Sequence, residues 1–240
     1  MKYFTKEWYK DSLVADMCFQ LRQTEKAFEY SDKFYEKLYA VEEKAYIRYR
    51  KRELKALKQS MTVDEIKEEF CKNTESNLEF VKSNLPDEIL SEIADVRILA
   101  LGSVTSDMHV KITKYCGRLN SKCQSVERRY EEESDEAFER IDGKTSKILS
   151  DLAGAELISI DQDTGKITLE LSNDYSDISF TLTNANATEE NAFVKGSFVV
   201  KPELIYNEEK KFEFSLLCIT DSLETHTYSF IADEISANKR

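Results

Sequence analysis

The hydrophobic pattern of the chain changes near Leu152-Ala153-Gly154. Before this point, apolar residues recur every three or four positions through long charged stretches, which is typical of amphipathic helices. After it they alternate in twos between short turns, as in Lys166-Ile167-Thr168-Leu169-Glu170-Leu171, which is typical of strands with one buried face. The change of period predicts two units, one helical and one built from strands, that meet near residue 150.

The first 150 residues carry start and stop signals for several helices. Thr5 suits the N-cap of a helix that begins near Lys6, and Thr62-Val63-Asp64-Glu65 has the pattern of a capping box. Pro86 suits the first turn of a helix whose apolar residues cover most of its circumference, so we expect that helix to be central. The expected helices cover residues 6–28, 31–60, 62–84, 86–101 and 106–141, followed by a short helical turn at 146–152. In the second of these, a buried stripe is predicted at 4-3-4 spacing, formed by Phe34, Leu38, Val41 and Ala45.

The remaining residues predict a sheet of about six strands. Residues 155–160 and 166–171 are expected to form a hairpin across Asp161-Gln162-Asp163-Thr164-Gly165. Pro202 interrupts a later apolar stretch, which favours an edge or a bend there. Because no helical pattern separates the strands, the sheet is expected to be antiparallel. The predicted fold class is therefore α+β, with a helical domain at 1–150 and an antiparallel β domain at 151–240.

Composition indicates a cellular compartment and excludes some kinds of binding site. No apolar run approaches the roughly 20 residues that cross a bilayer, and the opening residues lack the apolar core of a signal peptide. We therefore place the protein in the cytoplasm, away from membranes. The five cysteines are widely spread and form no Cys-x-x-Cys pair, as expected of small buried side chains in a reducing compartment. No dinucleotide fingerprint or phosphate loop is present, so we expect no cofactor.

The net charge of −12 is divided unevenly. Residues 151–240 hold 17 acidic and 7 basic side chains and carry −10, whereas residues 1–150 carry only −2. A strongly acidic β domain is a poor candidate for binding a phosphate backbone, and it suits either solubility or attraction of a basic protein.

One surface of the helical domain concentrates positive charge. Five basic side chains recur at 4-3-4-3 spacing and so share one face of the second predicted helix; they are Lys44, Arg48, Lys51, Lys55 and Lys58, and we call them the basic ridge. Three interpretations stay open: a solvated helix face, contact with an acidic protein surface, and contact with a nucleic acid.

Three other patterns resemble known sites, and each has a structural interpretation. His109, Cys116 and Cys123 lie seven apart on one predicted helix, about 10.5 Å between successive members, which is too far to share a zinc ion within that helix. They fit a packing seam instead. Asp161-x-Asp163-x-Gly165 lacks the glycine and glutamate positions of a helix–loop–helix calcium site and reads as an acidic turn. Asp221, Ser222 and His226 form a local triad-like cluster without a nucleophile elbow. The sequence therefore predicts no catalytic, cofactor-binding or metal-binding residues.

Three stretches resemble a bacterial, mostly Gram-positive family described as domain of unknown function 4085. They are residues 1–9 (MKYFTKEWY), 94–102 (ADVRILALG) and 230–235 (FIADEI). The resemblance implies a helical first part and a β last part, and it supplies no activity. The chain departs from the family pattern where it reads Leu152-Ala153-Gly154-Ala155, because related sequences carry a His-Asp pair there, and where Gly196–Val200 replaces a tryptophan-rich strand.

The function expected from these observations is non-enzymatic protein binding, of a regulatory or immunity-like kind, with the acidic β domain as one contact surface. An enzyme with a site at the helix–sheet boundary is the alternative; it would require a concave pocket with convergent polar groups. Nucleic-acid binding by the basic ridge is the weaker alternative. Neither the identity of a partner nor the oligomeric state follows from the sequence.

Overall fold

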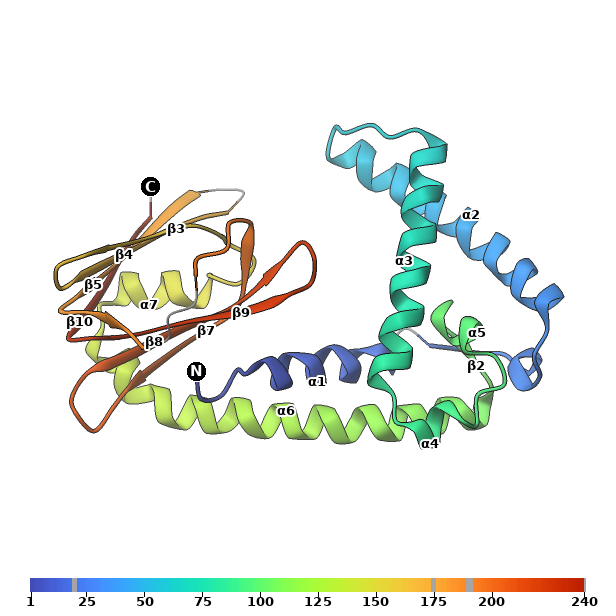
Figure 1. Cartoon of the computed structure of the whole chain (residues 1–240), viewed down its shortest axis with the longest axis horizontal. Coiled ribbons are helices and arrows are strands. Elements are labelled where there is room, and N and C mark those ends of the chain that lie inside the picture. The colour runs from blue at the N-terminus through green and yellow to red at the C-terminus, as the bar shows by residue number, and fades with distance from the viewer. Residues whose placement is uncertain (19–20, 174–175, 189–191, 240) are drawn as a thin grey trace. The chain divides into compact units, whose positions relative to one another are not determined.

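A computed structural model describes residues 1–18, 21–173, 176–188 and 192–239 of the chain. It has the α+β arrangement expected from the change of period, with helices in the N-terminal half followed by an antiparallel sheet (Figure 1). Among the described residues, none of the helices combines the length and the apolarity needed to span a membrane.

The helices predicted at 31–60, 62–84 and 106–141 form close to their expected limits, but the one predicted over 6–28 is wrong beyond its first half. It ends at Met17, and a short strand and a short 3-10 helix follow over 22–28. The capping box is present, with the hydroxyl of Thr62 accepting from the backbone N–H of Glu65 and the Glu65 carboxylate accepting from that of Thr62. The helices are α1 (Lys6–Met17), η2 (Glu25–Phe28), α2 (Asp32–Ala56), α3 (Val63–Asn84), α4 (Asp87–Leu90), α5 (Val96–Ala100), α6 (Ser106–Arg140) and α7 (Gly143–Ser150), and two short strands, β1 (Arg22–Gln23) and β2 (Ser103–Val104), pair in parallel.

The single central helix predicted over residues 86–101 is wrong. That segment forms two short helices, α4 and α5, because Asp95 adopts an extended conformation and caps α5. The Asp95 carboxylate accepts from the backbone N–H of Arg97 and from its guanidinium, at 2.8–3.0 Å. The apolar residues are therefore divided between two short helices: Ile98, Leu99 and Ala100 of α5 are buried, whereas Ile89 and Leu90 of α4 are only partly buried.

The buried stripe predicted for α2 is also wrong. Val41 is 53% exposed, Phe34, Leu38 and Ala45 are only half-buried, and none of the four belongs to a described core cluster. The side of α2 that packs on α3 carries tyrosines instead. The rings of Tyr39 and Tyr46 lie 5.0 and 5.4 Å from that of Phe70. The 3-4 spacing of apolar and aromatic residues gives α2 two faces that could be buried. Contact with α3 decides that the tyrosine face is the buried one.

The main sheet is antiparallel and has eight strands, more than the six or so expected. Its order is β10-β5-β4-β3-β7-β8-β9-β6. The predicted hairpin forms, but its turn is shorter than 161–165. Asp161–Asp163 belong to β3 and pair with β4, and Thr164 and Gly165 alone connect the strands, with Gly165 in the left-handed region at φ +71°. The strands are β3 (Glu156–Asp163), β4 (Lys166–Asn173), β5 (Ser176–Thr183), β6 (Asn186–Ala187), β7 (Ser197–Tyr206), β8 (Phe212–Thr220), β9 (Thr225–Ala232) and β10 (Glu234–Lys239).

Pro202 lies where an edge was predicted. Strand β7 pairs with β3 only through Ser197 and Phe198, and its register with β8 shifts between Val199 and Lys201. From that shift onward β7 pairs with β8 alone, so a residue without a backbone N–H is tolerated.

The chain folds into two compact units that do not follow the predicted domains 1–150 and 151–240. One unit comprises Met1–Asp11 and Ser121–Arg240, and the other comprises Ser12–Asn120. The first eleven residues join the sheet unit because a buried carboxylate in β7 binds their backbone. Glu203 accepts from the N–H groups of Lys2, Tyr3 and Phe4 at 2.6, 2.8 and 3.1 Å.

The N-terminal segment and α6 cover the free side of β7. The hydroxyl of Tyr130, in α6, accepts from the N–H of Leu204 at 3.1 Å, and burial raises the pKa of that phenol. Phe4 packs edge-on against both Trp8 and Tyr130. A strand that would otherwise expose its polar edge is thereby capped by side chains from distant segments.

The buried cysteines give a test of the packing in both units. Cys116 is buried in the core of the helical unit and Cys218 in that of the sheet unit; burial raises the pKa of each thiol to about 12, so each is nearly all protonated at pH 8. We expect iodoacetamide at pH 8 to modify the exposed Cys71 first and to spare Cys116 and Cys218 until urea is added. Peptide mass spectrometry measures this, and equal rates for Cys71 and Cys116 would contradict the packing.

Candidate functional site

The basic ridge lies on the exposed surface of the helical unit. Lys44, Arg48, Lys51 and Lys55 belong to α2, and all four are exposed. Lys58 is exposed too, but it lies two residues beyond the end of α2, in the left-handed region at φ +56°. The helix is therefore shorter than the predicted 31–60, and the ridge continues past its C-terminus.

The ridge points away from α3 because the opposite side of α2 packs against that helix. Tyr46 accepts a hydrogen bond from the Asn73 amide at 3.0 Å, and Arg50 binds Glu69 at 3.1 Å. At roughly 100° per residue along the chain direction, Tyr46 and Arg50 lie about 200° and 240° around the helix from Lys44. The helical hairpin of α2 and α3 (Figure 1) thus turns the ridge toward solvent.

Two further lysines lie on the ridge's face of α2 and were missed in the sequence. Lys33 and Lys37 fall within about 20° of Lys44 on the helix surface, and both are exposed. The same 4-3 spacing, continued toward the N-terminus with Ala40 at the skipped position, would have found them. With them, the positive face extends for about 33 Å from Lys33 to Lys55.

The positive charge of this face is not neutralised by α2 itself. Three of the helix's five acidic residues pair with arginines outside the ridge: Asp32 with Arg97, Glu42 with Arg22 and Glu53 with Arg50. The other two, Glu36 and Glu43, form no described ion pair with the ridge. Within the part of the chain that the structure describes, no ion pair involves any ridge residue. The face is a row of solvated cations available to an anionic partner.

The N-terminal end of α2 is held in place by Arg97. Its guanidinium lies 4.5 Å from the centres of both the Tyr30 and the Tyr35 rings, and it pairs with Asp95 and Asp32. These contacts join α5 to the first turns of α2. They fix the orientation of α2, and with it that of the positive face, on the helical unit.

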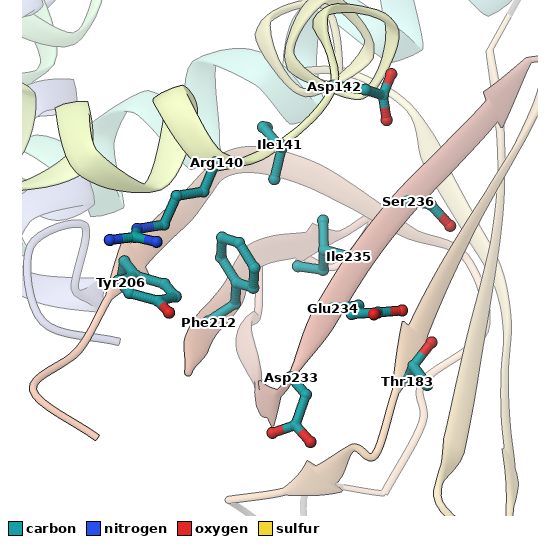
Figure 2. A pocket seen from close by; sticks show the side chains of 10 residues that line it. All are labelled: Arg140, Ile141, Asp142, Thr183, Tyr206, Phe212, Asp233, Glu234, Ile235 and Ser236. Atoms are coloured by element: carbon teal, nitrogen blue, oxygen red, sulfur yellow. The ribbon is translucent and has the colours of Figure 1, made fainter. Parts of the chain in front are cut away.

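A second candidate site is a cavity of about 610 Å³ within the sheet unit. Figure 2 shows the Phe212 and Ile235 side chains between Arg140 on one side and Thr183 on the other. The cavity is lined by Arg140, Ile141, Asp142, Thr183, Tyr206, Phe212, Asp233, Glu234, Ile235 and Ser236. It lies where α6 ends beside the sheet, the kind of place that the enzyme alternative requires.

The charged groups of this cavity are occupied by structural contacts. A hydrogen bond with Glu136, one turn earlier in α6, raises the pKa of Arg140, and the guanidinium lies 4.2 Å from the centre of the Tyr206 ring. The Thr145 hydroxyl, followed by backbone N–H groups at the start of α7, lowers the pKa of Asp142. These shifts arise from an ion pair and a helix cap, so they do not by themselves indicate acid–base chemistry.

The other patterns adopt their structural interpretations. Cys116 and Cys123 are buried along α6, as a packing seam requires, and their thiols reach the carbonyls of Val14 and Trp8 on α1. The Ser222 hydroxyl pairs with Thr220 rather than with His226, whose Nε2 lies 4.0 Å from a Glu224 oxygen. The triad-like cluster is therefore not assembled.

Comparisons with protein family models, with curated proteins and with solved structures find no match for this chain. The resemblance to the domain of unknown function 4085 family accordingly stays a prediction from the three stretches that carry it.

Proposed function

We propose that this protein is a cytoplasmic protein-binding module whose basic ridge contacts an acidic protein surface. The observation that carries the proposal is the uncompensated row of cations on α2, in a chain whose net charge is −12. Such a row attracts an anionic partner over about 8 Å in physiological salt. It speeds encounter and fixes orientation more than it adds affinity.

A protein partner is favoured over a nucleic acid for two reasons. The first is that the ridge carries no glycine-rich loop or row of aromatic side chains of the kind that holds phosphates or stacks bases. In addition, exposed apolar side chains flank the ridge, with Val41 and Tyr49 53% and 61% exposed. A phosphate backbone offers no apolar surface to cover them, whereas a protein does.

The contact is placed on α2 rather than on the acidic residues 151–240, where it was first expected. On α2 the basic ridge and the exposed apolar side chains lie on neighbouring faces of the same helix. The cavity beside α6 supports the enzyme alternative less, because its Arg140 and Asp142 already have structural partners.

We expect reversal of the ridge charges to abolish binding of an acidic polypeptide. The probe is fluorescein-labelled poly-L-glutamate, and the variant carries Lys44→Glu, Arg48→Glu, Lys51→Glu and Lys55→Glu. Fluorescence anisotropy should show affinity at least 100-fold weaker than for the parent protein, and the parent's affinity should fall steeply with salt, because the attraction is between exposed charges.

A matched control separates the ridge from net charge. The variant Lys67→Glu, Lys82→Glu, Lys114→Glu and Lys147→Glu makes the same change in charge at exposed sites outside α2. It should bind poly-L-glutamate less than tenfold more weakly than the parent. Equal losses in both variants would overturn the proposal, and tighter binding to duplex DNA than to poly-L-glutamate would favour the nucleic-acid alternative.

A further inference from the structure

An apolar stripe runs along α2 beside the basic ridge. Phe34, Leu38, Val41, Ala45 and Tyr49 follow one another at 4-3-4-4 spacing. At roughly 100° per residue they fall between about 60° and 140° around the helix from Lys44, and so between the ridge and the tyrosines that pack on α3. From Phe34 to Tyr49 the stripe is about 22 Å long.

The stripe is only partly covered by the described residues. Val41 and Tyr49 are 53% and 61% exposed, Phe34, Leu38 and Ala45 are half-buried, and no member belongs to a described core cluster. A helix of 25 residues normally buries its apolar stripe, since packing of that stripe supplies most helical stability. Here the tyrosine side is packed on α3, whereas Val41 and Tyr49 leave part of the apolar stripe uncovered.

The stripe and the ridge together have heptad spacing. Phe34 and Val41 occupy d positions, and Leu38 and Ala45 occupy a positions. In the same register Lys37, Lys44 and Lys51 occupy successive g positions. In a coiled coil, a and d residues form the seam, and charges at g select the flanking residues of the partner helix.

We propose that the partner segment is an acidic amphipathic helix that packs on this stripe and places carboxylates beside Lys37, Lys44 and Lys51. This proposal rests on the proposed function and names the partner's chemistry. A straight row of side chains at 3-4 spacing is complementary to the grooves of another helix. The lysines on one flank require that helix to carry Glu or Asp there, which is the charge complementarity that selects it.

A short seam implies a transient complex. Apolar a and d residues extend only from Phe34 to Ala45, because the next positions in this register, 48 and 52, are arginines. A binding segment of about two heptads therefore suffices, with further acidic residues opposite Arg48 and Arg52.

A pair of synthetic peptides tests the proposal with the full-length protein. One 21-residue peptide carries leucine at a and d and glutamate at e and g; the other has the same composition scrambled so that the leucines share no face. Fluorescence anisotropy should show at least tenfold tighter binding of the amphipathic peptide, and circular dichroism should show that it gains helix on binding. Equal affinities would overturn the proposal.

Substitutions in the stripe distinguish this inference from the proposed function. The double variant Leu38→Ser and Val41→Ser should weaken binding of the amphipathic peptide at least tenfold. Val110→Ser, at a 65% exposed position on α6, should leave it unchanged. If the ridge reversal abolishes binding and the stripe variant does not weaken it, the proposed function survives and the helical partner does not.

Two other occupants are also tested. Cosedimentation with vesicles of phosphatidylglycerol and phosphatidylcholine, lost in the stripe variant, would show that α2 lies on an anionic membrane surface and would overturn the proposal. Dimerisation of the protein alone in sedimentation velocity, lost in the same variant, would show that a second copy covers the stripe and would overturn it too. Neither is expected.

Discussion

Replacement of Glu203 with alanine is expected to release the N-terminal segment from the sheet and to lower the free energy of unfolding by about 3 kcal/mol. The carboxylate is buried, and its two oxygens accept from three consecutive backbone N–H groups, those of Lys2, Tyr3 and Phe4. Alanine removes all three acceptors at once, so buried donors lose charge-assisted hydrogen bonds that no neighbouring strand replaces.

Trp8 reports this release directly. It is the single tryptophan of the chain, and its ring centre lies 4.8 Å from that of Phe4, which Glu203 holds in place. In Glu203→Ala, tryptophan emission should shift to the red at a urea concentration below the main transition followed by circular dichroism. In the parent protein the two transitions should coincide.

Two matched variants support the interpretation. Glu203→Gln keeps one carbonyl acceptor and should lose about half as much stability as alanine. Glu208→Ala changes an exposed glutamate just beyond β7 and should stay within about 0.5 kcal/mol of the parent. Coincident transitions in Glu203→Ala, with stability equal to that of Glu208→Ala, would show that the carboxylate does not hold the segment.

Phe214→Ala is expected to cost about 4 kcal/mol, the largest effect of any single substitution considered. The ring is fully buried in the sheet core, and its centre lies 5.4 Å from that of Phe180 and 6.5 Å from that of Phe230. Alanine leaves a cavity between rings from β5, β8 and β9, and close packing prevents those strands from collapsing into it.

Urea unfolding followed by far-ultraviolet circular dichroism measures this loss. Since the chain has two compact units, the transition should be followed by Trp8 emission as well, which reports on the sheet unit. Phe214→Leu should cost only about 1 kcal/mol and gives a folded reference if the alanine variant does not fold. Phe28→Ala, at a 68% exposed ring, is the surface control. A cost at Phe214 no greater than at Phe28 would contradict the described core.

Local patterns in the sequence predicted several helices and strands correctly. The period of three to four over residues 106–141 predicted α6 (Ser106–Arg140), and the capping box predicted the start of α3. Alternation around a glycine-containing turn predicted the hairpin of β3 and β4. Each of these signals acts between residues close in the chain, where backbone geometry relates spacing directly to orientation.

The spacing of apolar residues gave the wrong prediction where two arrangements of the same segment fit it equally well. In α2 the stripe from Phe34 to Ala45 and the face of Tyr39 and Tyr46 have the same period, and only the position of Phe70 on α3 decides which is buried. In residues 86–101 an apolar circumference suggested one helix, whereas the hydrogen bonds of Asp95 to Arg97 divide the segment in two. The spacing of the ridge placed four of its residues on one face of α2, but it showed neither that Lys58 lies beyond the helix nor the direction in which the face points.

The sequence by itself therefore determined the α+β class, the change of period near residue 152, the helices α2, α3 and α6 and the row of cations at 4-3 spacing. Only the tertiary structure decided that Glu203 binds Lys2, Tyr3 and Phe4 some 200 residues away, and that the apolar stripe of α2 is only partly covered beside the ridge. The physical reason is that a periodic pattern relates a residue to its own helix or strand. The partner that covers a face is set by contacts between distant segments, whose energies depend on how the whole chain packs.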